Sequence, residues 1–272
     1  MVYAIFAASL LLAICAIYVA AVGWLYVCQE RLLFEPDPLA SDEPICTDPD
    51  TSEFFVQAPG ARLSVAHMSL PDPRGVFYFL HGNSGNLKKW FVKLDAFRQA
   101  NFDVVMLDYR GFGKSTGHIQ SEEQLHADVQ AVWEHFAPAY KGKRVVISGH
   151  SLGTGLAAGL AAQLSSNGNA PDLTLLVSPY SSMRALAAEL YPWVPRRLLR
   201  YPLQTMEFAA KLLGPVILIH GDRDELIGIH HSEALCKSMR SAELLRVRGA
   251  GHGDVHESPA TRRALVAALR RL

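Results

Sequence analysis

The stretch Val145-Val146-Ile147-Ser148-Gly149-His150-Ser151-Leu152-Gly153 decides how this chain folds. Its first three residues are apolar and β-branched, which is typical of a buried strand. The segment after Gly153 is rich in Ala and Leu and favours a helix. A serine between two glycines at such a junction lies on a sharp turn, and its hydroxyl projects at the carboxyl-terminal edge of the sheet. We therefore expect Ser151 to be a nucleophile on a mostly parallel sheet.

Similar apolar runs recur on both sides of this junction. Each is short enough for a buried strand, and the runs lie at 76–80, 104–107, 173–177, 216–219 and 244–247. Helical patterns separate most of them, and Ser121 followed by Glu123 and Gln124 predicts the start of one such helix. Short apolar strands that alternate with helices indicate the α/β class, with a mostly parallel central sheet and helices on both faces.

The amino terminus contains most of the chain's apolar excess. Half of the 272 residues are hydrophobic, and within 1–28 only Ser9 and Gly23 fall outside the hydrophobic set. The uncharged run is longer than the roughly 20 residues that a helix needs to cross a bilayer. A signal peptide begins with basic residues, but no Lys or Arg precedes Arg31. We predict an uncleaved transmembrane anchor over 1–28; the alternatives are a signal peptide and a buried core helix.

The chain is expected to have three parts: the anchor over 1–28, a linker and lead-in over 29–59, and the enzyme domain over 60–272. The second part is rich in Pro and acidic residues, which oppose a helix there. Between Arg31 and Arg62 there is no basic residue to retain this flank in the cytoplasm. We therefore expect a membrane protein with its enzyme domain on the non-cytoplasmic side.

A serine nucleophile needs a base, and the base needs an acid to orient it. On this architecture both should follow Ser151 in the chain, each in a loop after a strand. Position alone does not choose among the acids after the 216–219 strand, which are Asp222, Asp224 and Glu225. For the base we favour His252, because its glycine-rich loop suits a presented side chain. The other candidates lie where helices should begin, and they are His230, His231 and His256.

Acyl transfer also needs hydrogen-bond donors for the developing oxyanion. The N–H group of Leu152, directly after the nucleophile, is one predicted donor. The loop after the 76–80 strand should supply the other from the N–H group of Asn83, with Ser84 as its alternative.

Four motifs in this order resemble the α/β-hydrolase superfamily, and within it the membrane-anchored Bem46-like serine hydrolases. They are His81-Gly82-Asn83-Ser84-Gly85-Asn86, Asp108-Tyr109-Arg110-Gly111, Gly149-His150-Ser151-Leu152-Gly153 and His220-Gly221-Asp222-Arg223-Asp224. The resemblance covers about residues 60–270 and implies the α/β-hydrolase fold. It also implies that Asp224 is the triad acid and His252 the base, and that esters, thioesters or lipids are substrates.

The segment between the 173–177 and 216–219 strands has room for only two short helices, so we expect a minimal cap and an open site. Four apolar cap residues could line the site or lie on the membrane: Trp193, Val194, Leu198 and Leu199. The expected function is a membrane-anchored serine hydrolase that cleaves carboxylic ester or thioester bonds through an acyl-enzyme. The alternatives are a serine peptidase of the aminopeptidase type and an inactive, membrane-tethered binding protein.

Charge and composition bound the partners. The 26 basic and 26 acidic residues cancel, so no overall charge drives the protein toward nucleic acid. The eleven histidines form no metal-binding spacing, and we predict no metal and no cofactor. The expected partners are the membrane and a small-molecule or lipid acyl substrate. Whether Cys46 pairs with Cys236, and which oligomer forms, stay open.

Overall fold

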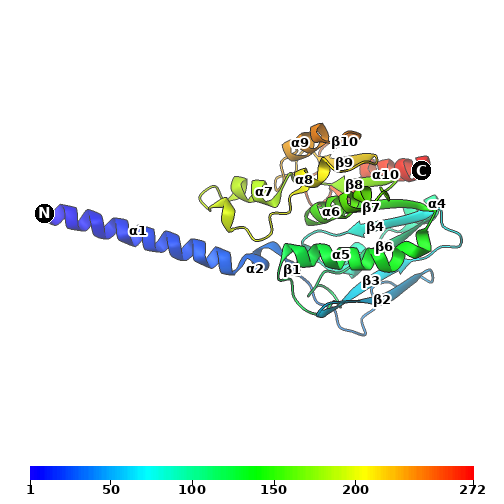
Figure 1. Cartoon of the computed structure of the whole chain (residues 1–272), viewed down its shortest axis with the longest axis horizontal. Helices are drawn as coiled ribbons and strands as arrows, with labels where there is room; N and C mark the ends of the chain where they lie inside the picture. Colours follow the sequence, from blue (N-terminus) through cyan, green and yellow to red (C-terminus); the bar gives the residue numbers. More distant parts are fainter.

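The structure is a computed structural model that describes residues 1–272 (Figure 1). Its strands are β1 (Glu35–Pro36), β2 (Thr51–Ala58), β3 (Ala61–Met68), β4 (Gly75–Leu80), β5 (Ser84–Gly85), β6 (Phe102–Leu107), β7 (Arg144–His150), β8 (Leu173–Val177), β9 (Val216–Gly221) and β10 (Ala242–Val247). Its α-helices are α1 (Val2–Val27), α2 (Gln29–Leu33), α3 (Leu87–Trp90), α4 (Asp95–Ala100), α5 (Glu122–Phe136), α6 (Leu152–Ser166), α7 (Met183–Leu190), α8 (Thr205–Ala209), α9 (His230–Ser238) and α10 (Pro259–Arg271). Three 3₁₀ helices are η1 (Ala137–Tyr140), η2 (Arg196–Leu198) and η3 (Val255–Glu257).

One eight-stranded sheet organises the molecule, in the order β10-β9-β8-β7-β4-β6-β3-β2. From β10 to β6 all neighbours are parallel, whereas β3 pairs antiparallel with both β6 and β2. The predicted fold class is confirmed. Each of the expected apolar runs forms a strand of the parallel part, which places the carboxyl ends of β4, β7 and β9 at one edge.

Both faces of the sheet are covered by helices. Neighbouring side chains of each strand point to opposite faces, so each strand contributes to two cores. Tyr78 and Ile147 belong to the larger core, which α5 and α6 close. The adjacent residues Phe77 and Val146 belong to the second core, which α4 and α10 close. This burial on two sides explains why the strands are continuous apolar runs rather than alternating ones.

The segment before residue 60 contains part of the sheet. β2, at 51–58, pairs along its whole length with β3, so the sheet begins at Thr51. Only Val56 of this edge strand is buried. A strand with so few buried positions shows little hydrophobic patterning, which is why it reads as part of a linker. The segment before it also contributes to the cores through Phe34 and Ile45, which are both buried.

Helix α1 projects away from the body, with the amino terminus at its tip and the carboxyl terminus at the far end of the molecule (Figure 1). None of its residues is buried. It is long and apolar enough to cross a membrane, although a signal sequence would have the same properties. Between β8 and β9 the chain forms two short α-helices, α7 and α8, with η2 between them. These residues are called the cap below, and their small extent is as expected.

Candidate active site

Ser151 lies at the turn between β7 and α6 with a backbone φ of 50° and ψ of −118°. A non-glycine residue in this region carries about 1–3 kcal/mol of strain, which only a close surrounding structure can maintain. Neither of the two flanking glycine positions has room for a side chain. A Cβ on Gly149 would lie 2.3 Å from the carbonyl oxygen of Gly153, and one on Gly153 would lie 2.1 Å from the carbonyl oxygen of Leu80.

The structure brings the three predicted catalytic residues into one hydrogen-bonded row. His252 Nε2 lies 3.0 Å from Ser151 Oγ, and His252 Nδ1 lies 2.8 Å from Asp224 Oδ2. The residues come from three separate loops, at the carboxyl ends of β7, β9 and β10. Such a row permits His252 to accept the serine proton while the carboxylate fixes the imidazole's orientation.

Asp224 is held in its charged form. Burial opposes its ionisation, but hydrogen bonds from His220, His252 and the N–H group of Ile227 outweigh burial and place its pKa well below the ordinary range. Asp224 Oδ1 also accepts hydrogen bonds from the N–H groups of Leu226 and Ile227, so Asp224 caps the turn that follows it.

Asp222, the competing acid, points elsewhere. Its Oδ1 accepts a hydrogen bond of 2.6 Å from the N–H group of Gly249, at the start of the loop that carries His252. In that same loop Asp254 Oδ1 accepts one from the N–H group of Gly251. Two carboxylates therefore shape the glycine-rich loop that presents the imidazole, and the alternative His256 lies in η3.

The two predicted oxyanion donors come from the residue after Ser151 and from the loop after β4. Leu152 is the first residue of α6, where helix N–H groups have no acceptor within the helix. The N–H group of Asn83 has no hydrogen-bond acceptor in the protein, and Asn83 lines the same cleft as Ser151 and His252. The alternative residue, Ser84, instead starts β5.

A contact that no sequence motif signals braces this loop. The two-residue strand β1 pairs in parallel with β5 directly after Asn83. The N–H group of Glu35 donates to the carbonyl oxygen of Asn83 at 2.8 Å, and the Asn86 side chain donates to the carbonyl oxygen of Asp37 at 2.9 Å. The lead-in that follows the amino-terminal helix thus holds the loop in place from outside the sheet.

Ser151 opens into a cleft of about 220 Å³, and Trp90 is the one hydrophobic residue among those that line it. The lining residues are Gly82, Asn83, Ser84, Lys89, Trp90, His150, Ser151, His252, Gly253, His256 and Glu257. A second, largely apolar cavity of about 150 Å³ lies beside it, between the sheet and helices α4 and α10. The Trp90 and His256 side chains, with ring centroids 5.3 Å apart, belong to the walls of both spaces.

His150 is a residue of this site that the sequence reasoning passed over. It is 4% exposed, and neither ring nitrogen has a hydrogen-bond partner. Burial, followed by the nearby His252 and His256, lowers the pKa of His150 well below its ordinary value. It is therefore a neutral imidazole in the wall of the cleft. Its place between Gly149 and Ser151 was visible, but nothing in the pattern showed its burial.

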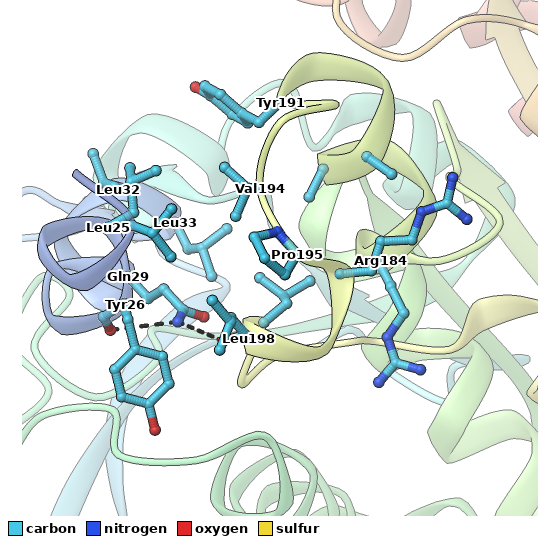
Figure 2. Close-up of a pocket in the computed structure, with 15 residues that line it drawn as sticks. Leu25, Tyr26, Gln29, Leu32, Leu33, Arg184, Tyr191, Val194, Pro195 and Leu198 are labelled. Atoms are coloured by element: carbon cyan, nitrogen blue, oxygen red, sulfur yellow. Dashed lines mark hydrogen bonds between the residues drawn. The ribbon is translucent and has the colours of Figure 1, made fainter. Parts of the chain in front are cut away.

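The cap leaves the cleft open. The apolar cap residues Val194, Leu198 and Leu199 do not line it, and instead face the end of α1 and α2 across a separate groove (Figure 2). Trp193 also lies at this side, where its carbonyl oxygen accepts a hydrogen bond from the Tyr18 hydroxyl. Of the two positions open from the sequence, the structure thus places these residues toward the amino-terminal helix.

The structure also describes the cysteines and one cluster of possible metal ligands. All four cysteines, Cys46 and Cys236 included, are free thiols. Outside the cleft, Glu189, His230 and His231 gather their side-chain ligand atoms within 4.8 Å. However, the N–H group of Ser181 donates to His231 Nδ1, so the ring proton lies on Nε2 and faces Glu189. That arrangement favours a neutral His231 imidazole facing the Glu189 carboxylate over a metal site.

The comparisons with known proteins identify the family of the chain. The family model described as serine aminopeptidase, S33, matches residues 71–207, which include Asn83 and Ser151 but end before Asp224 and His252. The α/β hydrolase domain-containing protein 17B of Homo sapiens and that of Xenopus tropicalis are each 31% identical over 191 residues. That alignment covers 68% of this chain and 62% of either relative, so the chain spans less than two thirds of their length. An uncharacterised protein of Mycobacterium tuberculosis is 33% identical over 180 residues, which is 64% of this chain and 61% of that protein.

Solved structures share the fold at low sequence identity. An esterase of Pyrococcus furiosus superposes with a TM-score of 0.67 at 16% identity, over 88% of this chain and 97% of its own. The thioesterase domain of the curacin biosynthetic pathway gives 0.61 at 16% identity, over 80% and 99%. With the family model matching half of its length, the chain belongs to the α/β-hydrolase superfamily.

Proposed function

We propose that this protein is a membrane-anchored serine hydrolase that cleaves carboxylic ester or thioester bonds. Ser151 Oγ attacks the carbonyl carbon while His252 Nε2 takes the serine proton, and Asp224 orients and stabilises the resulting imidazolium. The N–H groups of Leu152 and Asn83 bind the oxyanion. His252 returns the proton to the leaving group, and a water molecule then releases the acyl group from Ser151 by the same steps.

The row of hydrogen bonds from Asp224 through His252 to Ser151 is the observation that supports this mechanism. The strained backbone at Ser151 adds to it, because strain of this kind persists where the surrounding structure enforces it. The intact row also argues against the interpretation as an inactive binding protein, because binding alone does not require a nucleophile, a base and an acid that are hydrogen-bonded to one another.

The lining of the cleft favours an acyl ester or thioester over a peptide with a free amine. An aminopeptidase needs a carboxylate for the substrate's ammonium group, and the one acid in the cleft is Glu257. Glu257 already pairs with Lys93 at 2.9 Å. The apolar cavity beyond Trp90 offers room for a small-molecule or lipid acyl chain. Turnover of aminoacyl amides and of acyl esters, measured side by side, separates an aminopeptidase from an ester or thioester hydrolase. Faster turnover of the amides would refute the proposed function.

Helix α1 is proposed to remain as the anchor, with the body on the non-cytoplasmic side. The Tyr18 hydroxyl donates to the carbonyl oxygen of Trp193 at 3.0 Å, so the helix makes a contact with the folded body that a cleaved signal sequence would not make. We also propose that the enzyme unit begins at Thr51, with 29–50 as its lead-in. Activity of an alkaline phosphatase domain fused after Leu272 tests the orientation, since that enzyme folds only outside the cytoplasm.

The decisive experiment is Ser151→Ala in the full-length chain. We expect turnover of p-nitrophenyl butyrate and labelling by a fluorophosphonate to disappear, while the melting temperature stays close to that of the wild type because Ala keeps the Cβ and removes only the hydroxyl. Ser166→Ala, whose hydroxyl bonds to the Ala162 carbonyl oxygen on the outer end of α6, is the matched control and should keep both activities. Labelling that persists in Ser151→Ala would exclude Ser151, and an unlabelled wild type would revive the inactive binding protein.

A further inference from the structure

The groove between the amino-terminal helix and the cap is a second candidate site, separate from the catalytic cleft. We call it the cap–anchor groove, and it has a volume of about 140 Å³. Its lining comes from the last turns of α1, from α2 and from the cap, and eleven of its fifteen residues are hydrophobic. Figure 2 shows Leu25, Leu32 and Leu33 on one side, facing Val194 and Pro195 on the other.

Hydrogen bonds fix the two walls of the groove to each other. The buried Gln29 side chain donates to the carbonyl oxygen of Leu198 at 2.8 Å (Figure 2). It also accepts a hydrogen bond of 2.8 Å from the N–H group of Arg200. Glu30 pairs with Arg200 and accepts a hydrogen bond of 2.8 Å from the Tyr201 hydroxyl. A groove with walls cross-linked in this way stays open as a formed site rather than closing on itself.

The length of α1 sets the depth of this groove relative to a bilayer. The helix has 26 residues and is about 39 Å long at 1.5 Å per residue, whereas the hydrocarbon core is about 30 Å thick. Some six residues therefore extend beyond the core. The α1 residues that line the groove are Val22, Leu25 and Tyr26, and they lie in the part of the helix next to the charged residues Glu30 and Arg31, which favour a place outside the core. The groove consequently opens at the level of the lipid headgroups.

The charges beside the groove are unbalanced. The two charged residues that line it are Arg184 and Arg196, and neither forms an ion pair with a carboxylate. The neighbouring Arg197 has no such partner either, whereas Arg200 is neutralised by Glu30. Two guanidinium groups without a carboxylate partner, on residues that line an apolar groove, match a ligand that has an acyl chain and a negatively charged head.

We propose that the cap–anchor groove binds one anionic phospholipid, with an acyl chain along the leucine wall and the phosphate at Arg184 and Arg196. This inference rests on the membrane insertion of α1 in the proposed function, but not on the catalytic residues. Bound in this way, a lipid stabilises the cap against the anchor and orients the body on the membrane. The carboxyl-terminal edge of the sheet, with Ser151, lies on this same side, because β1 follows α2 and pairs next to Asn83.

Native mass spectrometry of the full-length chain in detergent tests the proposal, with phosphatidylglycerol or phosphatidylcholine added. We expect one phosphatidylglycerol to bind at least tenfold more tightly than phosphatidylcholine. The double variant Arg184→Gln/Arg196→Gln should lose this preference, since each cation near an anionic lipid contributes about fivefold. Ala188→Trp, which fills the groove from the cap side, should weaken both lipids.

The control is Arg270→Gln/Arg271→Gln, which removes the same charge at the far end of the molecule and should bind lipid as the wild type does (Figure 1). Equal affinity for the two lipids, a lipid preference that survives the Arg184/Arg196 change, or a lipid-free dimer would overturn the proposal. Turnover of water-soluble p-nitrophenyl butyrate should be unchanged in the Arg184/Arg196 variant, and Ser151→Ala should still bind lipid. These two readouts separate a failure of the groove from a failure of the hydrolase assignment.

Discussion

At the scale of single residues, the site depends on two glycines, on the strained backbone of Ser151 and on a buried histidine without a hydrogen-bond partner. Gly149 and Gly153 have no room for a Cβ, because the first turn of α6 approaches β7 and the end of β4 too closely. This close approach forces the unusual backbone of Ser151 and presents its hydroxyl to His252. Beside them His150 is enclosed without a hydrogen-bond partner, which is costly unless the ring stays neutral.

The depressed pKa of His150 predicts how stability depends on pH. The unfolded chain takes up a proton at this histidine below about pH 6.5, whereas the folded chain excludes it. The free energy of unfolding therefore keeps its full value above that pH. Below it, the free energy of unfolding falls by up to about 1.4 kcal/mol per pH unit for one proton. Urea titrations of the full-length chain in detergent, followed by tryptophan fluorescence, should show a shallower decline between about pH 5 and 6.5 for His150→Asn. His118→Asn removes an exposed histidine and serves as the control; an unchanged slope in His150→Asn would contradict the prediction.

At the scale of elements, the smallest strands have the largest effect on the site. β1 and β5 contain two residues each, yet their pairing ties the lead-in to the loop that carries Asn83. The same loop is fixed on its other side by Trp90, whose indole N–H donates to the carbonyl oxygen of Ser84 at 3.0 Å. In the proposed mechanism both contacts act by positioning the N–H group of Asn83, because an oxyanion donor must be held in place before the reaction starts.

Glu35→Pro tests the brace without changing any group in the cleft. Proline removes the N–H group that donates to the Asn83 carbonyl oxygen, and Phe34 before it already has the extended backbone that a proline requires, with φ −122° and ψ 123°. Losing an oxyanion donor costs about 10²–10³ in kcat, so a displaced donor should cost about 10-fold to 100-fold. We expect kcat for p-nitrophenyl butyrate to fall and KM to stay nearly constant.

Glu35→Ala keeps the N–H group and should retain wild-type kcat, so it is the matched control. Equal kcat values for the proline and alanine variants would show that the lead-in does not position the loop. An equal fall in both would assign the effect to the glutamate side chain instead.

At the scale of the whole molecule, the protein consists of an unburied apolar helix joined firmly to a folded hydrolase. The joint is made by Gln29 and Glu30, which bond to the cap, and by Phe34, which packs edge-to-face on Tyr201 with ring centroids 5.2 Å apart. The helix therefore emerges at a defined place beside the cap and the edge of the sheet that carries Ser151. With α1 inserted in a membrane as proposed, the site would face substrates at the membrane surface.

Retention of the anchor predicts that the protein stays with membranes after a wash at alkaline pH and is released by detergent. The intact mass of the purified protein should then include residues 1–28, because no cleavage separates α1 from the body. A soluble product that lacks these residues would identify α1 as a signal sequence. The measurement does not depend on activity, so Ser151→Ala serves equally well for it.

The parallel strands and the nucleophile turn were predictable because their signals are local. A strand buried on both faces is an apolar run, and a turn that excludes every side chain larger than hydrogen needs glycine at Gly149 and Gly153. The edge strand β2 was not predictable in this way, because an edge strand with a single buried residue leaves no such run. The choice between Asp222 and Asp224 was equally invisible, since both follow β9 within three residues.

The sequence by itself determined the fold class, the position of the serine turn and the presence of an apolar helix, because each depends on neighbours within a few residues. Only the tertiary structure decided which carboxylate meets His252, which loop the lead-in braces and that the cap faces the anchor instead of the cleft. These outcomes depend on groups that are far apart in the chain, as with Gln29 and Leu198 or Glu35 and Asn83. Their hydrogen bonds form only after the sheet has brought the loops to one edge, so no local pattern encodes them.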